Sequence, residues 1–228
     1  MQCLILAGGL GTRIDAVADG LPKSMIPVAG RPFIAHQLDW LAAGGVDQVV
    51  ISTGYRGQAI RDFVADRQIV CIDEGQDLLG TGGAVRLAVE RGVMKPGFFV
   101  LYGDSYLDVD LSKVWTSAEN GRKPLMTVFR NQGQWDTSNV VFRDGQIALF
   151  EKGRTDAAEI GMEYIDYGLS VLTTAVVEDT MAPDLADVFH QLSRRGELLG
   201  FEATRRFYEI GSPAGLADLE AHLTGEPG

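Results

Sequence analysis

The segment Leu4-Ile5-Leu6-Ala7-Gly8-Gly9-Leu10-Gly11-Thr12-Arg13 decides the fold. The apolar run at residues 2–7 is typical of a strand buried on both faces, and glycines and a basic residue follow it. Glycines let backbone N–H groups approach a phosphate, and open parallel sheets bind ligands at their carboxyl edge. The segment lacks the Gly-Lys-Ser/Thr ending of a P-loop and the third glycine of the dinucleotide fingerprint.

Strand-like and helix-like segments alternate through the first half of the chain. Apolar β-type runs are found at residues 47–53, 68–72 and 97–102. Helical spacing of apolar residues is found between them, at residues 33–43, 58–66 and 83–90. This alternation predicts a parallel sheet built from strand–helix–strand units.

The pattern changes after about residue 124. Strands are predicted at residues 125–130, 139–142, 146–150 and 165–172, and Arg143-Asp144-Gly145 is a hairpin signal. Helices are predicted at 184–194 and 213–223, with extended segments at 198–203 and 206–210. We expect one domain over residues 1–228. Its two halves are residues 1–124 and an antiparallel α+β part, residues 125–223, that packs onto the same sheet, and residues 224–228 form a loose tail.

Composition excludes several classes of function. The chain has 228 residues, is 46% hydrophobic and carries a net charge of −11, which argues against nucleic acid or an anionic membrane as partner. Cys3 and Cys71 lie in apolar runs and are expected to be free thiols, and metal-type Cys/His spacing is absent. No signal peptide or membrane span is indicated, so we expect a cytoplasmic protein. The sequence leaves a homo-oligomer open.

The motifs together resemble those of the sugar-phosphate nucleotidyltransferase family. The glycine-rich segment followed by Pro22-Lys23 carries this resemblance. It continues in the family's order at Leu79-Gly80-Thr81-Gly82-Gly83-Ala84, Leu101-Tyr102-Gly103-Asp104, Phe150-Glu151-Lys152 and Tyr208-Glu209-Ile210-Gly211-Ser212-Pro213. The chain is most similar to heptose-1-phosphate guanylyltransferases, with N-acetylmuramate-1-phosphate uridylyltransferases next. The implied fold is a single-domain, Rossmann-like α/β fold. Its mixed, mainly parallel sheet is flanked by helices and has a small antiparallel sugar-binding part.

The resemblance implies that an NTP, with GTP favoured, reacts with a sugar 1-phosphate and releases pyrophosphate. Arg13 can grip phosphate oxygens with its forked guanidinium, and Lys23 resembles the family's lysine at the α-phosphate. The nucleotide-binding candidates are Leu6, Ala7, Gly8, Gly9, Gly11, Thr12, Arg13, Lys23, Glu74, Gly80, Thr81, Gly82, Gly83 and Asp104. Among these, Glu74 is the candidate that reads the edge of the base.

The second half is expected to hold the sugar phosphate. By resemblance, Glu151 bonds sugar hydroxyls and Lys152 grips the phosphate, so Arg13, Lys23 and Lys152 are the catalytic candidates. Further sugar-phosphate candidates are Asn139, Asp166 and Gly168. For a Mg²⁺ cofactor, Asp104 is the first ligand, because a carboxylate just past a strand at this edge suits a hard cation. The resemblance implies Glu209 as the second candidate ligand, at a position where many relatives have an aspartate.

Two other functions stay open at this point. One is uridylyl or cytidylyl transfer to N-acetylmuramate 1-phosphate, another sugar phosphate or phosphocholine. The other is a non-catalytic nucleotide-sugar-binding regulator, although retention of the charged candidates argues against lost activity.

Overall fold

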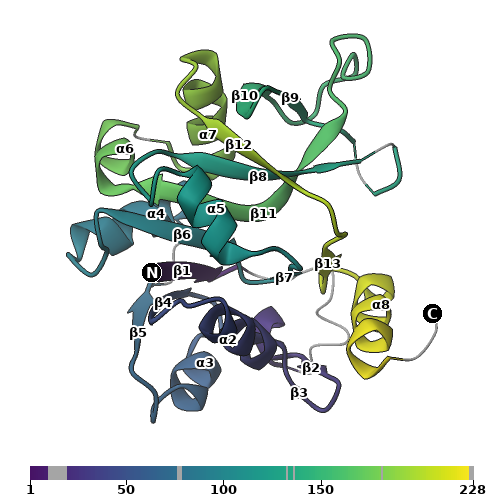
Figure 1. Ribbon diagram of the computed structural model, residues 1–228. Helices are drawn as coiled ribbons and strands as arrows, with labels where there is room; N and C mark the ends of the chain where they lie inside the picture. Colours follow the sequence, from purple (N-terminus) through teal and green to yellow (C-terminus); the bar gives the residue numbers. More distant parts are fainter. Residues whose placement is uncertain (10–19, 76–78, 132, 136, 181, 226–228) are drawn as a thin grey trace.

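The computed structural model of the chain describes residues 1–9, 20–75, 79–131, 133–135, 137–180 and 182–225. A nine-stranded sheet runs through it in the order β5-β4-β1-β6-β11-β8-β12-β10-β9 (Figure 1). Its strands are β1 Gln2–Ala7, β4 Gln48–Thr53, β5 Ile69–Asp73, β6 Gly97–Tyr102, β8 Leu125–Arg130, β9 Val140–Arg143, β10 Gln146–Phe150, β11 Tyr164–Thr173 and β12 Leu199–Ala203. Strands from both halves of the chain therefore share one sheet.

The first four strands of this order, β5, β4, β1 and β6, are all parallel. From β6 onward the pairings are antiparallel, except that β12 runs parallel to β8. The mixed α/β class expected from the sequence is confirmed. The antiparallel expectation for the second half is wrong at β12, because helix α7 (Leu185–Arg194) crosses back before β12 and returns the chain in the direction of β8.

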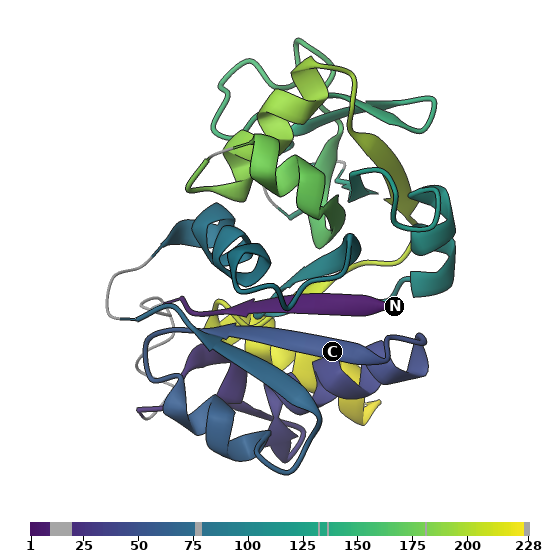
Figure 2. The same ribbon diagram turned by 90° about the vertical axis from the view of Figure 1, so that its left-hand side faces the viewer.

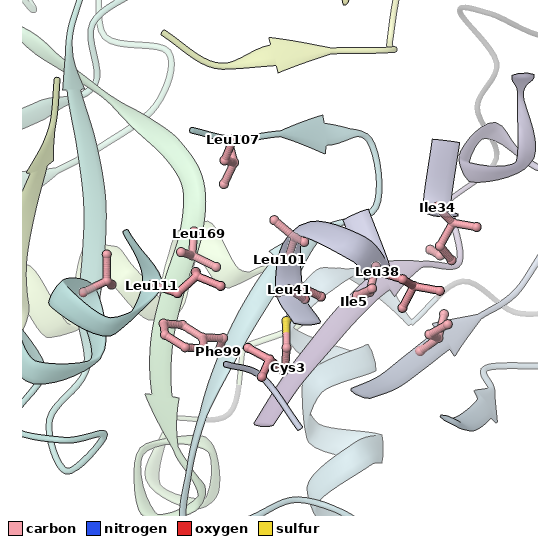
Figure 3. Close-up of a cluster of buried hydrophobic side chains, with 14 of the residues drawn as sticks. Cys3, Ile5, Ile34, Leu38, Leu41, Phe99, Leu101, Leu107, Leu111 and Leu169 are labelled. Carbon is pink, nitrogen blue, oxygen red and sulfur yellow. The ribbon is translucent and has the colours of Figure 1, made fainter. Parts of the chain in front are cut away.

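Helices cover both faces of the sheet (Figure 2). One face packs against α2 Phe33–Ala43, α3 Gln58–Phe63 and α5 Leu111–Ser117, and the other against α4 Gly80–Glu90, α6 Thr174–Asp179 and α7. Figure 3 shows Ile34, Leu38 and Leu41 of α2 facing Ile5 and Leu101 of the sheet. These side chains are at most 6% exposed, so burial of apolar surface fixes α2 on this face.

Small elements complete the chain. They are the 3-10 helix η1 Lys23–Met25, the strands β2 Pro27–Val28, β3 Arg31–Pro32, β7 Ser105–Tyr106 and β13 Tyr208–Glu209, and helix α8 Pro213–Thr224. β7 pairs with β13, so the C-terminal part of the chain lies beside the short strand that follows β6. Among the described residues, no helix has the length and apolar character needed to cross a bilayer.

Several sequence predictions are confirmed and others are wrong. The Asp144-Gly145 signal is a hairpin turn between β9 and β10, with both residues at positive φ. Both cysteines are free thiols, and Cys3 is buried. Helices α5 and α6 were not predicted, because six or seven residues span fewer than two turns and leave no clear periodicity. The prediction of a loose tail at residues 224–228 is wrong at Thr224, which is the last residue of α8. Gly225 caps that helix in the left-handed conformation.

Candidate active site

A cavity of about 340 Å³ opens where β1 and β6 end. We call it the glycine-rim cavity. It is lined by residues that the sequence singled out, namely Leu6, Ala7, Gly8, Gly9, Lys23, Glu74, Gly80, Thr81 and Asp104. It is also lined by Ser24, Ala84, Tyr102, Gly103 and Gly211, which were not candidates. The predicted Gly11, Thr12 and Arg13 lie outside the described residues.

A side chain at Gly8 would meet the carboxylate of Glu74. A Cβ built there would lie 2.1 Å from Oε1 of Glu74, so the glycine lets this carboxylate rest against the backbone of the rim. Glu74 is held in place by its own N–H, which donates to the Thr53 carbonyl at 2.8 Å, and by the Ser52 hydroxyl, which donates to Oε1 at 2.8 Å. Burial raises the pKa of Glu74 above its ordinary value, while the Ser52 hydrogen bond partly opposes the shift.

Lys23 and Asp104 form an ion pair in the wall of the cavity. Nζ of Lys23 lies 2.8 Å from Oδ2 of Asp104, and the lysine side chain is 17% exposed. Lys23 begins η1, whereas Asp104 follows β6 and its carbonyl accepts a hydrogen bond from the N–H of Ile210 at 3.0 Å. A cation and a carboxylate from distant parts of the sequence therefore meet beside the glycines.

Glu209 lies on β13, where it pairs with Ser105 next to Asp104. Its carboxylate accepts hydrogen bonds from the N–H of Gly211 and, at 2.8 Å, from the Ser212 hydroxyl. Within the described ranges no cluster of three or more His, Cys, Asp or Glu ligands exists. The carboxylates of Asp104, in the turn before β7, and Glu209, on β13, are still a donor set that fits Mg²⁺, because this ion takes one or two carboxylates and completes its shell with water and substrate phosphates.

The glycines before and within α4 have two different roles. Gly80, at a φ of 73°, and Thr81 line the cavity. The N–H groups of Gly82 and Gly83 instead donate to the carbonyl of Pro183, at 2.8 and 3.1 Å. A Cβ at Gly82 would lie 2.3 Å from the Ala182 carbonyl oxygen, so this glycine serves close packing of α4 on the 182–183 segment.

A group of residues that we call the Asp166 cluster lies next to the cavity and consists of Asn139, Glu151, Lys152, Asp166 and Gly168. It begins at an irregularity in β11, where the register against β8 shifts between Asp166 and Ser170. Gly168, at a φ of 102°, donates its N–H to Oδ1 of Asp166 at 3.0 Å. Burial raises the pKa of Asp166, and this backbone hydrogen bond and the charge of Lys152 oppose the shift.

The rest of the Asp166 cluster is joined by hydrogen bonds across strands. Oδ1 of the buried Asn139 accepts from the N–H of Asp166 at 3.2 Å, and its carbonyl accepts from the N–H of Glu151 at 2.9 Å. Lys152 lies over the Phe150 ring, is exposed and makes no ion pair with the residues that the structure describes. The sequence candidates of the second half therefore meet in one place.

Tyr102 connects the two regions and was missed by sequence reasoning. It lines the glycine-rim cavity, and its hydroxyl lies close enough to the Asp166 carboxylate to lower the pKa of that group. Its carbonyl accepts from Nε2 of the fully buried Gln37 at 2.9 Å. The signal available in the sequence was its position directly before Gly103-Asp104. Gln37 carries no such signal, because it looks like any polar residue on a helix.

Comparisons with known proteins identify a family and several relatives that this chain resembles. A family model described as MobA-like NTP transferase domain matches residues 3–201. A D-glycero-alpha-D-manno-heptose 1-phosphate guanylyltransferase of Aneurinibacillus thermoaerophilus is 28% identical over 222 residues, covering 93% of this chain and 94% of that protein. A glucose-1-phosphate cytidylyltransferase of Salmonella typhimurium is 26% identical and covers 89% of this chain and 88% of its own length. A crystal structure of HddC from Yersinia pseudotuberculosis complexed with GMP-PN has a TM-score of 0.77 and 25% identity, covering 97% and 99% of the two chains.

Proposed function

Because the chain belongs to the MobA-like NTP transferase family and is a sugar-1-phosphate nucleotidyltransferase, we propose that it makes a GDP-heptose from GTP and a heptose 1-phosphate. The observation that carries this proposal is the Lys23–Asp104 pair in a glycine-rimmed cavity, linked by Tyr102 to the Asp166 cluster. One region suits a nucleoside triphosphate, and the other suits a phosphorylated sugar.

Glu74 supports the choice of guanine. Its carboxylate lines the cavity and is an acceptor for donors on a base edge. Guanine carries two adjacent donors, N1–H and the N2 amino group, which match a carboxylate in a bidentate pair. Uracil has one ring donor between two acceptors, and cytosine has its amino group beside an acceptor, so neither offers that pair of donors.

The reaction requires charge neutralisation rather than a protein nucleophile. A sugar-phosphate oxygen forms a bond to the α-phosphorus as the bond to the β-phosphate oxygen breaks, and pyrophosphate leaves. The attacking phosphate is already ionised, so positioning and electrostatics carry the rate. Lys23 meets the negative charge at the α-phosphate, and Arg13 is assigned by resemblance to the leaving pyrophosphate. Asp104 and Glu209 would hold Mg²⁺, which supplies further positive charge to the phosphate oxygens when bound.

The Asp166 cluster is assigned to the sugar phosphate. Lys152 is the exposed cation of this region and is assigned to the phosphate group. Glu151 and Asn139 are assigned to sugar hydroxyls, because carboxylate and amide groups form hydrogen bonds of the kind that orient polyols. Asp166, through its bond to Gly168, fixes the irregular part of β11 under the sugar.

Pyrophosphate release tests the proposed function directly. GTP, UTP, CTP and dTTP are each combined with heptose, mannose, glucose and N-acetylmuramate 1-phosphates and Mg²⁺. GTP with the heptose phosphate is expected to give the highest kcat/KM, and EDTA is expected to abolish release. Preference for UTP with N-acetylmuramate 1-phosphate would support the alternative enzyme, and binding of nucleotide sugar without any release would support a regulator.

The role of Glu74 has its own test. Glu74→Gln replaces one acceptor oxygen by a donor, so kcat/KM for GTP is expected to fall about tenfold or more relative to UTP. Glu178→Gln is the matched control, because Glu178 is an exposed residue of helix α6 in the second half of the chain. An unchanged ratio of GTP to UTP in the Glu74 variant would refute base reading by this carboxylate.

A further inference from the structure

A second cavity, of about 530 Å³, lies between the segment that follows β8 and the segment that precedes β11. We call it the loop cavity. It adjoins the Asp166 cluster through two residues of its lining. Arg154 donates from Nη1 to Oε2 of Glu151 at 2.9 Å, and Ser138 directly precedes Asn139 in the chain. A sugar held by Glu151 and Asn139 would therefore have this cavity at one end.

The lining of the loop cavity has an apolar floor and a polar wall. Ala157 and Met162 are 7% and 3% exposed and belong to a small apolar cluster under the loop. Ser138 and Thr155 supply hydroxyl groups, and the buried Asn131 orients the Ser138 hydroxyl by donating to it from Nδ2 at 3.1 Å. Carbohydrates present C–H groups and hydroxyls together, so a floor and wall of this kind match them.

The charged side chains of the loop cavity are paired with one another. Arg154 binds Asp156 as well as Glu151, and Nη2 of Arg130 lies 2.9 Å from Oε2 of Glu163. The hydrogen bond from Arg154 lowers the pKa of Asp156, which keeps that partner ionised and the guanidinium neutralised. These pairs join three carboxylates to two guanidinium groups, so a carboxylate entering this cavity would meet a net negative charge, whereas a hydroxyl would not.

We infer that the loop cavity receives the outer end of the sugar, namely a neutral, hydroxyl-bearing carbon chain that extends beyond a hexose ring. The inference rests on the proposed function and deepens it, because it says why a heptose phosphate is selected over a hexose phosphate. It also predicts rejection of a sugar whose exocyclic end carries a carboxylate, such as a hexuronic acid 1-phosphate.

Filling the loop cavity tests this inference. Ala158 lines it but is exposed, so Ala158→Phe adds a ring to the cavity without entering the apolar floor. With GTP as the nucleotide, the KM for heptose 1-phosphate is expected to rise about tenfold or more, while the KM values for mannose 1-phosphate and GTP stay within about twofold. Ala43→Phe, at an exposed position at the end of α2, is the matched control and is expected to change none of them.

A second variant removes a hydroxyl group from the loop cavity instead of filling its volume. Thr155→Val keeps the shape of an exposed side chain and deletes its hydroxyl, and it is expected to weaken heptose 1-phosphate binding several-fold in calorimetry, with mannose 1-phosphate unaffected. Equal effects on both sugars, or none on either in both variants, would overturn the inference. So would wild-type preference for a hexuronic acid 1-phosphate. Wild-type enzyme that turns over hexose phosphates only would reject the inference while leaving nucleotidyl transfer intact, and no turnover of any pair would reject the proposed function itself.

Discussion

The glycine-rim cavity and the Asp166 cluster meet at Tyr102, but they are built in opposite ways. Around the cavity, the wall is backbone held at close range. A Cβ at Gly8 would collide with Glu74, and one at Gly103 would lie 2.5 Å from the carbonyl oxygen of Leu6. In the Asp166 cluster, side-chain hydrogen bonds hold the backbone in place: Asn139 accepts from the N–H of Asp166 on β11, and Asp166 accepts from the N–H of Gly168 on the same strand. The glycine-rim cavity depends on the absence of glycine side chains, and the Asp166 cluster depends on side-chain hydrogen bonds.

This difference predicts which kinds of substitution impair each region. The cavity should be sensitive to added atoms and to loss of its charges, and the effects should fall on GTP. The Asp166 cluster should be sensitive to lost acceptors and donors, and the effects should fall on the sugar phosphate. Measurement of both KM values for every variant therefore tests the comparison itself.

The largest effect is expected from the charged pair in the cavity wall. Lys23→Ala and Asp104→Asn are each expected to lower kcat by about 10²-fold or more, since each removes one electrostatic stabiliser of the reacting phosphates. Steady-state pyrophosphate release measures this loss. Lys113→Ala is the control, because Lys113 pairs with Asp110 on the surface of α5 and is expected to change little. Near-normal turnover of either site variant would remove that residue from the mechanism.

A smaller effect is expected from Gly8. Gly8→Ala forces Glu74 away from the rim, so kcat/KM for GTP is expected to fall about 30-fold with loss of preference for guanine. In a Glu74→Ala background, which removes the atoms that a Cβ at Gly8 would meet, Gly8→Ala is expected to add little further loss. Circular dichroism establishes that all variants fold. An equal loss from Gly8→Ala in both backgrounds would show that close approach of Glu74 is not the cause.

The same contrast explains what the sequence could and could not predict. Gly8 and Asp104 were found because a cavity built at strand ends uses short motifs that closely follow strands, and Lys23 was found through the Pro22-Lys23 motif. Tyr102 and the buried Gln37 were missed, because their roles depend on contacts with Asp166 and with a distant carbonyl that no local pattern encodes. The sheet class followed from alternation of strands and helices. The parallel pairing of β12 with β8 depends on where α7 returns the chain, which is a long-range property.

In the Asp166 cluster, removal of the Asp166 charge is expected to impair use of the sugar phosphate and to raise the stability of the fold. Asp166→Asn is expected to raise the KM for the sugar phosphate about tenfold, with the KM for GTP unchanged, because the support of Gly168 is weakened. The same variant should unfold at a higher temperature at neutral pH. Burial raises the pKa of Asp166, so the folded state favours the neutral carboxyl and bears a cost when that group ionises.

The pH dependence of unfolding checks the sign of this argument. The contribution of Asp166 to stability is fully present below its ordinary pKa and is lost as pH rises through its raised folded-state pKa. The difference in Tm between Asp166→Asn and the wild type should therefore widen as pH rises across that interval and then level off. A variant that is less stable than the wild type at neutral pH would show that the hydrogen bonds of Asp166 outweigh its burial.

The smallest effect is expected at the residue where the two regions meet. Tyr102→Phe keeps the ring in the cavity wall and deletes the hydroxyl beside the Asp166 carboxylate, so the sugar KM is expected to rise only about threefold to fivefold. The hydroxyl lowers the pKa of Asp166, and its loss should move the acid limb of kcat/KM for the sugar phosphate to higher pH. In Asp166→Asn that displacement should vanish, because no carboxylate remains to titrate, and adding Tyr102→Phe should bring no further shift. A change in the KM for GTP alone would instead mean that Tyr102 serves the cavity by packing, and the two regions would then be independent.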